Sequence, residues 1–464
     1  MPRGRKLRLA LLVAAGLILG GTALWPGRSR TALAVPGGPV VRYIGATHGT
    51  NHTAPVDSPL VSILPGSLRD LVRQTFGTPR QGVSTYTTYE PSLAVWIESA
   101  PTAPSGGGAP GGMPIGLLGL LADANGVEAG GEQWLNLPAA ILANPRVDFF
   151  SFGAVPRRSR QLTLRLYDQP GAEDHSLVGE LALPNPLHGA WPIWEPERLP
   201  LTRTNEDLEC TLLHLVTGIR IDPVSSTAAG GCAFPPARPG DTSGAAAVFR
   251  FARAGVPDDE WTVGARRITD ATGNSLKSGR VISPRLTDCV VHAFAPVLWP
   301  DEVWDLDVWA RRTETARFDE ADLIVLDDIA VPPNGETNRL DRAFLRHGIE
   351  IKVESFAHQP PPSPGGHSTR DLTRLNVKPR GLPEGCFLDL VELTDQTGRE
   401  LKPVASFQEG PPQRAMVWAF HSVPEGAQRL RLRLALQQGR HFRFRVQPER
   451  APTNVAQIEL PPGG

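Results

Sequence analysis

The chain has 464 residues, which exceeds what one hydrophobic core supports, because single cores stop growing at about 250–300 residues. We therefore expect about three domains. Its 47 lysines and arginines nearly cancel its 48 aspartates and glutamates, and the formal net charge is −1. This balance excludes a global positive charge for binding phosphates, so no nucleic-acid partner is expected.

The first 35 residues are predicted to be a signal anchor or a signal peptide. Four basic residues within 3–8 precede an uncharged apolar run at 9–25, which is the pattern of an export signal. As a helix this run spans about 25 Å, close to the shortest length that crosses a bilayer. Arg28 and Arg30 favour an uncleaved anchor, and the alternative is cleavage after Ala34 and secretion. The membrane is the expected partner of the anchor, with the body outside the cytoplasm, in the periplasm or at the cell surface.

Residues 36–90 are predicted to form a linker with one short helix. Ser67 can cap this helix and Gly77 can end it. His48 and His52 have the i, i+4 spacing with which a helix could present two metal ligands. The glycine between them and the proline that follows argue against a helix, so a flexible polar linker is the preferred interpretation.

Four sequence elements recur in the same order three times. The first is an Asp-x-x-Gly segment, which has the composition of a tight turn between antiparallel strands. A phenylalanine and a proline follow, and then a run of alternating apolar and polar residues predicts a strand buried on one face. The last element is a strand-like segment that a proline ends. The turns lie at 123–126, 270–273 and 395–398, and the closing prolines are Pro184, Pro332 and Pro461.

These copies predict an all-β fold of three tandem immunoglobulin-like or fibronectin-like β-sandwiches behind the N-terminal signal-anchor helix. The middle copy contains seven candidate strands, the number typical of such a sandwich. The expected boundaries are 91–190 for sandwich 1, 196–334 for sandwich 2 and 336–464 for sandwich 3.

Cys210 and Cys232 are the candidate disulfide. None of the four cysteines belongs to a Cys-x-x-Cys pair, and an exported protein meets an oxidising compartment. The two flank a loop at 218–231 that is rich in glycine and alanine, and a bridge there would stabilise by about 3 kcal/mol in the chain-entropy model. The alternative is buried free thiols. Cys289 and Cys386 are expected in different domains and are not paired with each other.

Two further features have both a ligand-binding and a structural interpretation. Acidic and amide side chains between Asp327 and Asp341 could supply oxygen ligands to Ca²⁺, but their spacing matches no calcium loop, so a solvated strand end is preferred. Trp191 and Trp194 lie in a proline-rich segment between sandwiches 1 and 2. They could stack on a sugar, but packing of the two domains against each other is preferred.

The sequence contains no Gly-x-Ser-x-Gly, His-Glu-x-x-His, phosphate loop or dinucleotide-binding motif. We therefore expect a protein that is not an enzyme, without catalytic, cofactor-binding or metal-binding residues. The expected function is a structural or partner-binding role in the cell envelope, for a membrane-anchored extracytoplasmic protein whose partner is a protein or a glycan. The alternatives are a carbohydrate-binding or carbohydrate-processing surface protein, and an exported hydrolase whose catalytic triad comes from distant positions.

Overall fold

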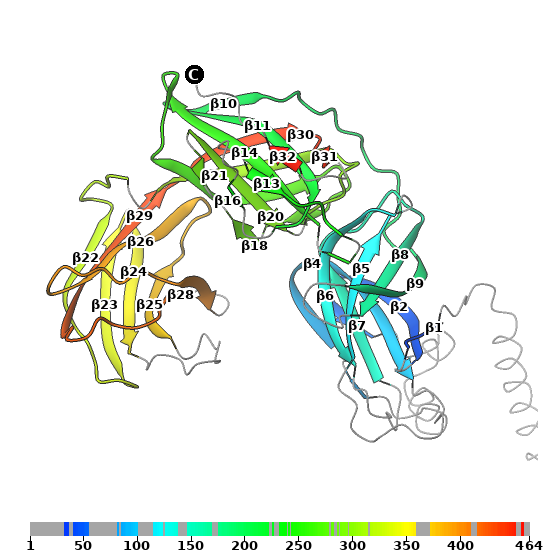
Figure 1. Cartoon of the computed structure of the whole chain (residues 1–464), viewed down its shortest axis with the longest axis horizontal. Helices are drawn as coiled ribbons and strands as arrows, with labels where there is room; N and C mark the ends of the chain where they lie inside the picture. The colour runs from blue at the N-terminus through cyan, green and yellow to red at the C-terminus, as the bar shows by residue number, and fades with distance from the viewer. Residues whose placement is uncertain are drawn as a thin grey trace, which may run out of the picture.

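A computed structural model describes residues 32–36, 40–54, 81–82, 85–100, 115–123, 126–137, 146–168, 175–221, 225–226, 232–238, 240–241, 243–277, 280–282, 285–286, 288–295, 297–313, 316–358, 372–409, 415–451 and 456–458. The apolar run at 9–25 and the helix expected between Ser67 and Gly77 lie outside these residues. Within them every regular element is a strand, and no helix is long and apolar enough to cross a membrane. Figure 1 shows three β-sandwich units, which we number 1 to 3: blue to cyan, mainly green, and yellow to orange.

Sandwich 1 begins earlier in the chain than expected. Its sheets have the orders β1-β2-β4-β7-β3 and β6-β5-β8-β9. The strands are β1 (Ala32–Ala34), β2 (Val40–Thr53), β3 (Gln81–Gly82), β4 (Thr85–Ala100), β5 (Ile115–Ala122), β6 (Glu128–Leu137), β7 (Arg146–Phe152), β8 (Gln161–Asp168) and β9 (Ser176–Pro184). Because β2 pairs with β4, residues 40–53 are part of the sandwich, and the linker expected at 36–90 is corrected there. Bulges at Tyr43/Gly45 and Gly49/Asn51 break the alternation of β2, which hides this strand in the sequence.

Sandwich 2 has one sheet whose main path is β10-β11-β14-β20-β18 and another of the order β17-β16-β21-β30. Its main strands are β10 (Leu201–Asn205), β11 (Leu208–Ile219), β14 (Gly244–Arg253), β16 (Trp261–Asp270), β17 (Ser275–Leu276), β18 (Arg280–Ile282), β20 (Cys289–Ala295), β21 (Trp304–Arg312) and β30 (Arg440–Val446). The short strands are β12 (Ser225–Ser226), β13 (Cys232–Phe234), β15 (Val256–Pro257), β19 (Arg285–Leu286), β31 (Glu449–Arg450) and β32 (Ala456–Ile458). Of these, β31 pairs with β11 and β32 with β13, so residues near the end of the sequence complete this unit.

Sandwich 3 has sheets of the orders β23-β24-β25-β28-β27 and β22-β29-β26. The strands are β22 (Leu323–Ala330), β23 (Thr337–Arg346), β24 (Ile349–Ala357), β25 (Thr373–Arg380), β26 (Cys386–Asp395), β27 (Ala405–Glu409), β28 (Ala415–Phe420) and β29 (Arg429–Gln438). Among the described strands its second sheet ends at β26, which is therefore an edge strand within this part of the chain.

Sandwiches 2 and 3 exchange one strand each. In sandwich 1, β9 follows β8 in the chain and pairs with it. In sandwich 2 the corresponding partner of β21 is β30, whereas β22, which follows β21 in the chain, pairs with β29 of sandwich 3. Sandwich 3 is thus inserted between β21 and β30, and Figure 1 shows the red β30 among the green strands of sandwich 2.

This connection corrects the domain boundary expected at 334–336. Residues 323–330 are part of sandwich 3, and residues 440–446 are part of sandwich 2. Both segments alternate buried and more exposed residues over part of their length. Such a pattern predicts a strand with one buried face, but it does not say which sheet receives the strand.

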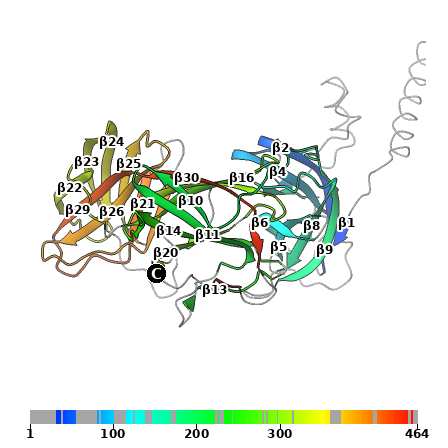
Figure 2. The same ribbon diagram turned by 90° about the horizontal axis from the view of Figure 1, so that it is seen from above.

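One apolar core runs through sandwiches 1 and 2, and a second fills sandwich 3. The first contains Phe150 of β7 and Leu164 of β8 together with Leu306 of β21 and Phe444 of β30. The second is made of residues from both sheets of sandwich 3. In Figure 2 the three units follow one another in a row, with sandwich 2 in the middle.

The three Asp-x-x-Gly segments form turns with the same hydrogen bond. The N–H groups of Gly126, Gly273 and Gly398 donate to the aspartate carbonyl oxygens at 3.0, 3.1 and 2.9 Å. The φ angles of these glycines are 79°, 81° and 83°, in the left-handed region that strains other residues. The turn of sandwich 2 also contacts sandwich 1, because the Asn274 amide makes two hydrogen bonds with the backbone of Val155, at 2.8 and 3.0 Å.

Candidate functional site

Two aromatic rings fill the junction between sandwiches 2 and 3. Phe387 of β26 lies against Gly264 of β16, where an added Cβ would come within 2.7 Å of the ring. Trp309 of β21 lies against Gly385 in the same way. A side chain at either glycine would push the ring away, so glycine permits the close contact of the two units.

Hydrogen bonds cross the same junction. Arg311 of β21 forms an ion pair with Asp389 of β26. Gln437 of β29 donates to the other Asp389 oxygen at 2.7 Å and accepts a hydrogen bond from the Arg312 backbone N–H at 2.7 Å. Because Gln437 is buried and its amide is satisfied from both units, this network fixes how β21 lies against sandwich 3.

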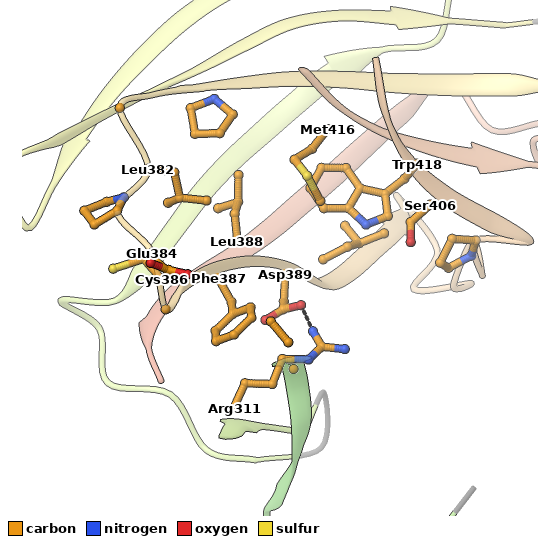
Figure 3. Close-up of a pocket in the computed structure, with 18 of the residues that line it drawn as sticks. Arg311, Leu382, Glu384, Cys386, Phe387, Leu388, Asp389, Ser406, Met416 and Trp418 are labelled. Carbon is orange, nitrogen blue, oxygen red and sulfur yellow. Dashed lines mark hydrogen bonds and ion pairs between the residues drawn. The ribbon is translucent and has the colours of Figure 1, made fainter. Parts of the chain in front are cut away.

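A cavity of about 870 Å³ opens beside this junction, between β26 and the β27–β28 side of sandwich 3. Figure 3 shows Arg311 reaching from β21 to Asp389 at its border. The lining combines apolar side chains with an exposed polar rim: Leu388, Leu390, Met416 and Trp418 are apolar, and Glu384 and Ser406 are at the rim. This is the candidate functional site, because its lining brings apolar side chains and polar groups together in one concave surface, as binding sites do.

The outer side of β26 borders this cavity. On its other side β26 pairs with β29. On the outer side, the pairing within the described residues is a bridge between Thr394 and Glu400 and a hydrogen bond from the Leu401 N–H to the Leu393 oxygen, at 2.7 Å. The corresponding strand of sandwich 1, β5, is instead paired by β6 from Ile115 to Ala122. Residues 386–391 of β26 thus have a strand neighbour on one side, as far as the described chain extends.

A second cavity, of about 580 Å³, shares Pro383, Glu384 and Cys386 with the first. The guanidinium groups of Arg253 and Arg312 lie 5.9 and 5.8 Å from the centre of the Trp261 ring. The charges around this cavity are largely matched among themselves, as shown by the Arg253–Asp258 pair at 3.0 Å and the His347–Asp322 pair at 2.7 Å. We therefore place the candidate site in the first cavity.

His52 and Ser92 form the contact that most resembles a catalytic pair. His52 Nε2 lies 3.1 Å from Ser92 Oγ, and His52 Nδ1 lies 3.0 Å from Thr47 Oγ1. Burial lowers the pKa of His52, which keeps the ring neutral at pH 7. However, a threonine stands where a catalytic triad has a carboxylate, and His52 and Ser92 are only 1% and 6% exposed. Trp96 Nε1 also donates to Thr47 Oγ1, at 2.9 Å, so the arrangement has the form of a buried hydrogen-bond network.

The interior of sandwich 2 holds a buried arginine. Arg266 is 7% exposed, and its guanidinium lies 4.0 Å from the centre of the Phe294 ring. Burial lowers the pKa of Arg266 to about 10, and the side chain makes no ion pair with the residues that the structure describes. Burial, together with the charge of Arg266, lowers the pKa of His292 to about 3. At neutral pH, Arg266 is therefore charged and His292 is neutral.

The structure does not test the disulfide between Cys210 and Cys232, because the side chain of Cys232 lies outside its described part. Cys210 is buried in the core shared by sandwiches 1 and 2. β13, which carries Cys232, contributes Phe234 to a cluster on the opposite face of β14. The pairing stays a prediction. Cys289 and Cys386 lie in sandwiches 2 and 3, on β20 and β26.

The acidic side chains considered as Ca²⁺ ligands and the two tryptophans considered as sugar-binding residues make contacts within the protein. Asp327 and Asp328 pair with Arg431 and Arg429, each at 3.0 Å, and Asp341 pairs with Lys352 at 2.7 Å. The structure shows no group of His, Cys, Asp and Glu that could hold a metal among the residues it describes. The tryptophans lie beneath cations: Arg157 is 5.5 Å from the Trp191 ring, and Arg445 is 4.7 Å from the Trp194 ring. His48 is exposed on β2.

The sequence did not single out Arg311, Asp389 or Gln437. Each is one polar residue in an alternating strand, and the partners are 78 and 48 positions apart. Gly264 and Gly385 are the sequence feature that could have indicated this junction, because glycine in or beside a strand often marks the close approach of another part of the molecule.

Comparisons with protein-family models, with curated proteins and with solved structures find no match for this chain.

Proposed function

We propose that this chain is an exported, membrane-attached protein whose three sandwiches form a scaffold, without enzymatic activity, that presents a binding surface in the cell envelope. The observation that carries the proposal is the exchange of β22 and β30, which joins sandwiches 2 and 3 by two chain crossings. The shared core of sandwiches 1 and 2 adds a second large contact. Units held in a fixed arrangement lose less freedom when a partner binds, which suits a scaffold.

The strand orders support sandwiches of the immunoglobulin type. In sandwich 2 the run β11-β14-β20-β18 lies in one sheet and β17-β16-β21-β30 forms the other. These orders correspond to A-B-E-D and C′-C-F-G of an immunoglobulin sandwich. Sandwich 3 follows the same scheme with β24-β25-β28-β27 and β26-β29-β22, except that its G-type strand precedes the others in the chain.

Export is tested in the cells that make the protein. The full chain should sediment with membranes and be digested when protease is added to intact spheroplasts. A chain without residues 1–31 should stay soluble and protected inside the cells, since it lacks the apolar run. A mature N-terminus at Val35 would show that the signal is cleaved after Ala34 and would contradict the anchor. Protection of the full chain inside spheroplasts would contradict export.

One observation favours a second candidate function, an exported serine hydrolase. The 3.1 Å contact of His52 Nε2 with Ser92 Oγ would let the imidazole take the hydroxyl proton. The burial of both residues and the threonine at Nδ1 count against it. A fluorophosphonate probe decides: labelling of the folded protein that Ser92→Ala removes supports a hydrolase, and absence of labelling supports the scaffold.

Carbohydrate binding through the tryptophans has less support. One face of each ring carries an arginine guanidinium, which occupies the surface that a sugar would stack on. Binding on a glycan array that Trp194→Ala abolishes would favour this alternative.

A further inference from the structure

We propose that the outer edge of β26 at 386–391 binds an extended segment of a partner protein as an added β-strand, with a basic residue of that segment at Glu384. The inference rests on the proposed function and specifies the partner-binding surface. It is carried by the strand edge that no described residue pairs at 386–391, by the cavity beside it and by the charges around the cavity.

The outer edge of β26 is open to pairing at 386–391 within the described chain. The backbone N–H and C=O groups on the outer side of an edge strand offer a template for another chain. In sandwich 1 this position is filled by the chain itself, since β6 runs along β5. In sandwich 3 the described chain covers only the far end of β26, where Thr394 forms a bridge and the Leu401 N–H donates a hydrogen bond. Six residues, at about 3.3 Å each, leave about 20 Å of edge.

The cavity next to this edge has an apolar wall that could receive side chains of an added strand. Side chains of an added strand would point alternately into the sandwich and out to water. The inward ones would meet the cavity wall of Leu388, Met416 and Trp418. Its volume of about 870 Å³ has room for several side chains. The partner segment should therefore have apolar residues at every second position.

The charges around the cavity favour a basic residue in the bound segment. Arg311 and Asp389 neutralise each other at the border of the cavity. Glu384 is exposed at the rim and forms no ion pair with the described residues. The charged residues that line this cavity are Arg311, Asp389 and Glu384, so the lining has a formal net charge of −1, which favours a lysine or arginine in the bound segment.

The test uses the purified full chain in detergent and displayed random peptides of about twelve residues. The expected result is enrichment of peptides that alternate apolar and polar residues and carry a lysine or arginine. Binding of a synthetic copy of the best peptide should slow hydrogen exchange by about tenfold or more at the outward-facing amides within 386–391, about every second one, because these amides become hydrogen-bonded.

Two variants place the peptide. Ser406→Trp fills the cavity from its exposed rim and should abolish binding, whereas Glu384→Lys should weaken it by about fivefold through loss of a rim charge. Glu425→Lys makes the same charge change on an exposed residue outside the lining and should leave binding unchanged. Circular dichroism checks that each variant is folded.

Three results would overturn the inference: no enriched peptide, peptides that bind the Ser406→Trp variant equally well, or binding to glycans in place of peptides. If the protein self-associates and Ser406→Trp abolishes this, the occupant of the edge is a second copy of the chain. That result would overturn the inference that a different protein binds there. None of these results bears on export, so the membrane part of the proposed function is tested separately.

Discussion

Arg311 and Asp389 are 78 positions apart in the chain and form an ion pair between two sandwiches. Their side chains are 29% and 12% exposed, so the pair is partly withdrawn from water. Asp389 also accepts the hydrogen bond from Gln437, at 2.7 Å. The pair is therefore the centre of the polar contact between sandwiches 2 and 3.

Removing one partner of this pair should destabilise the protein. Arg311→Met leaves Asp389 without its cation, and we expect a loss of about 1–2 kcal/mol in the free energy of unfolding. Arg431→Met is the matched control, because the Arg431–Asp327 pair is 56% and 64% exposed and should contribute less than about 0.5 kcal/mol. Urea unfolding of both variants measures the difference. Equal losses would show that burial at the junction does not strengthen the pair.

The strand exchange predicts which fragments fold. Residues 316–438 contain all strands from β22 to β29 and should fold alone, with a cooperative β-type transition on heating. Residues 196–334 lack β30 and carry β22 without β29, so β21 would expose an unpaired edge and the fragment should aggregate or unfold without cooperativity. Far-ultraviolet circular dichroism on heating compares the two. A cooperative 196–334 fragment would contradict the insertion.

Arg266 should lower stability because it is charged, buried and without an ion pair among the described residues. Arg266→Met keeps a long side chain in the core and removes the charge, and it should stabilise the protein by about 1–2 kcal/mol. Arg267→Met, at the neighbouring and more exposed position, should change stability little. A lower melting temperature for Arg266→Met would mean that the contact with Phe294 outweighs the cost of burying the charge.

His292 should make the protein sensitive to acid. Its pKa is about 3 when folded, below its usual value near 6.5 when unfolded. The unfolded chain therefore binds a proton more readily, and the stability held above pH 6.5 is lost as the pH falls towards 3. The loss from this residue should approach about 1.4 kcal/mol per pH unit. In His292→Gln, the fall in melting temperature between pH 6.5 and 4.5 should be smaller than in the parent; an equal fall would assign the acid sensitivity to other groups.

The all-β class and many strand positions could be predicted from the sequence, because alternation and turn residues act locally. The turns at Asp123, Asp270 and Asp395 are examples, since each glycine N–H bonds within its own four residues. The placement of β22 and β30 could not be predicted in this way, because either strand could cover β21 as far as its apolar pattern shows.

The candidate site at β26 could not be predicted from local sequence patterns either, because it depends on how distant segments pack. Among the described strands, β26 is an edge because none of them pairs with its outer side at 386–391, and the residues of β26 themselves do not indicate this. Arg311 and Gln437 are single polar residues in their strands, and their contacts form only where the two sandwiches pack against each other.

The exchange of β22 and β30 also sets the order in which the units can close as the chain emerges during synthesis or export. The last strand of sandwich 3, β29, ends at residue 438, whereas sandwich 2 must wait for β30, which ends at residue 446. The third unit can therefore be complete while the second still shows the open side of β21. Sandwich 2 starts earlier than its neighbour and finishes later, so a delay in the chain just after residue 438 would hold the molecule at its most aggregation-prone stage.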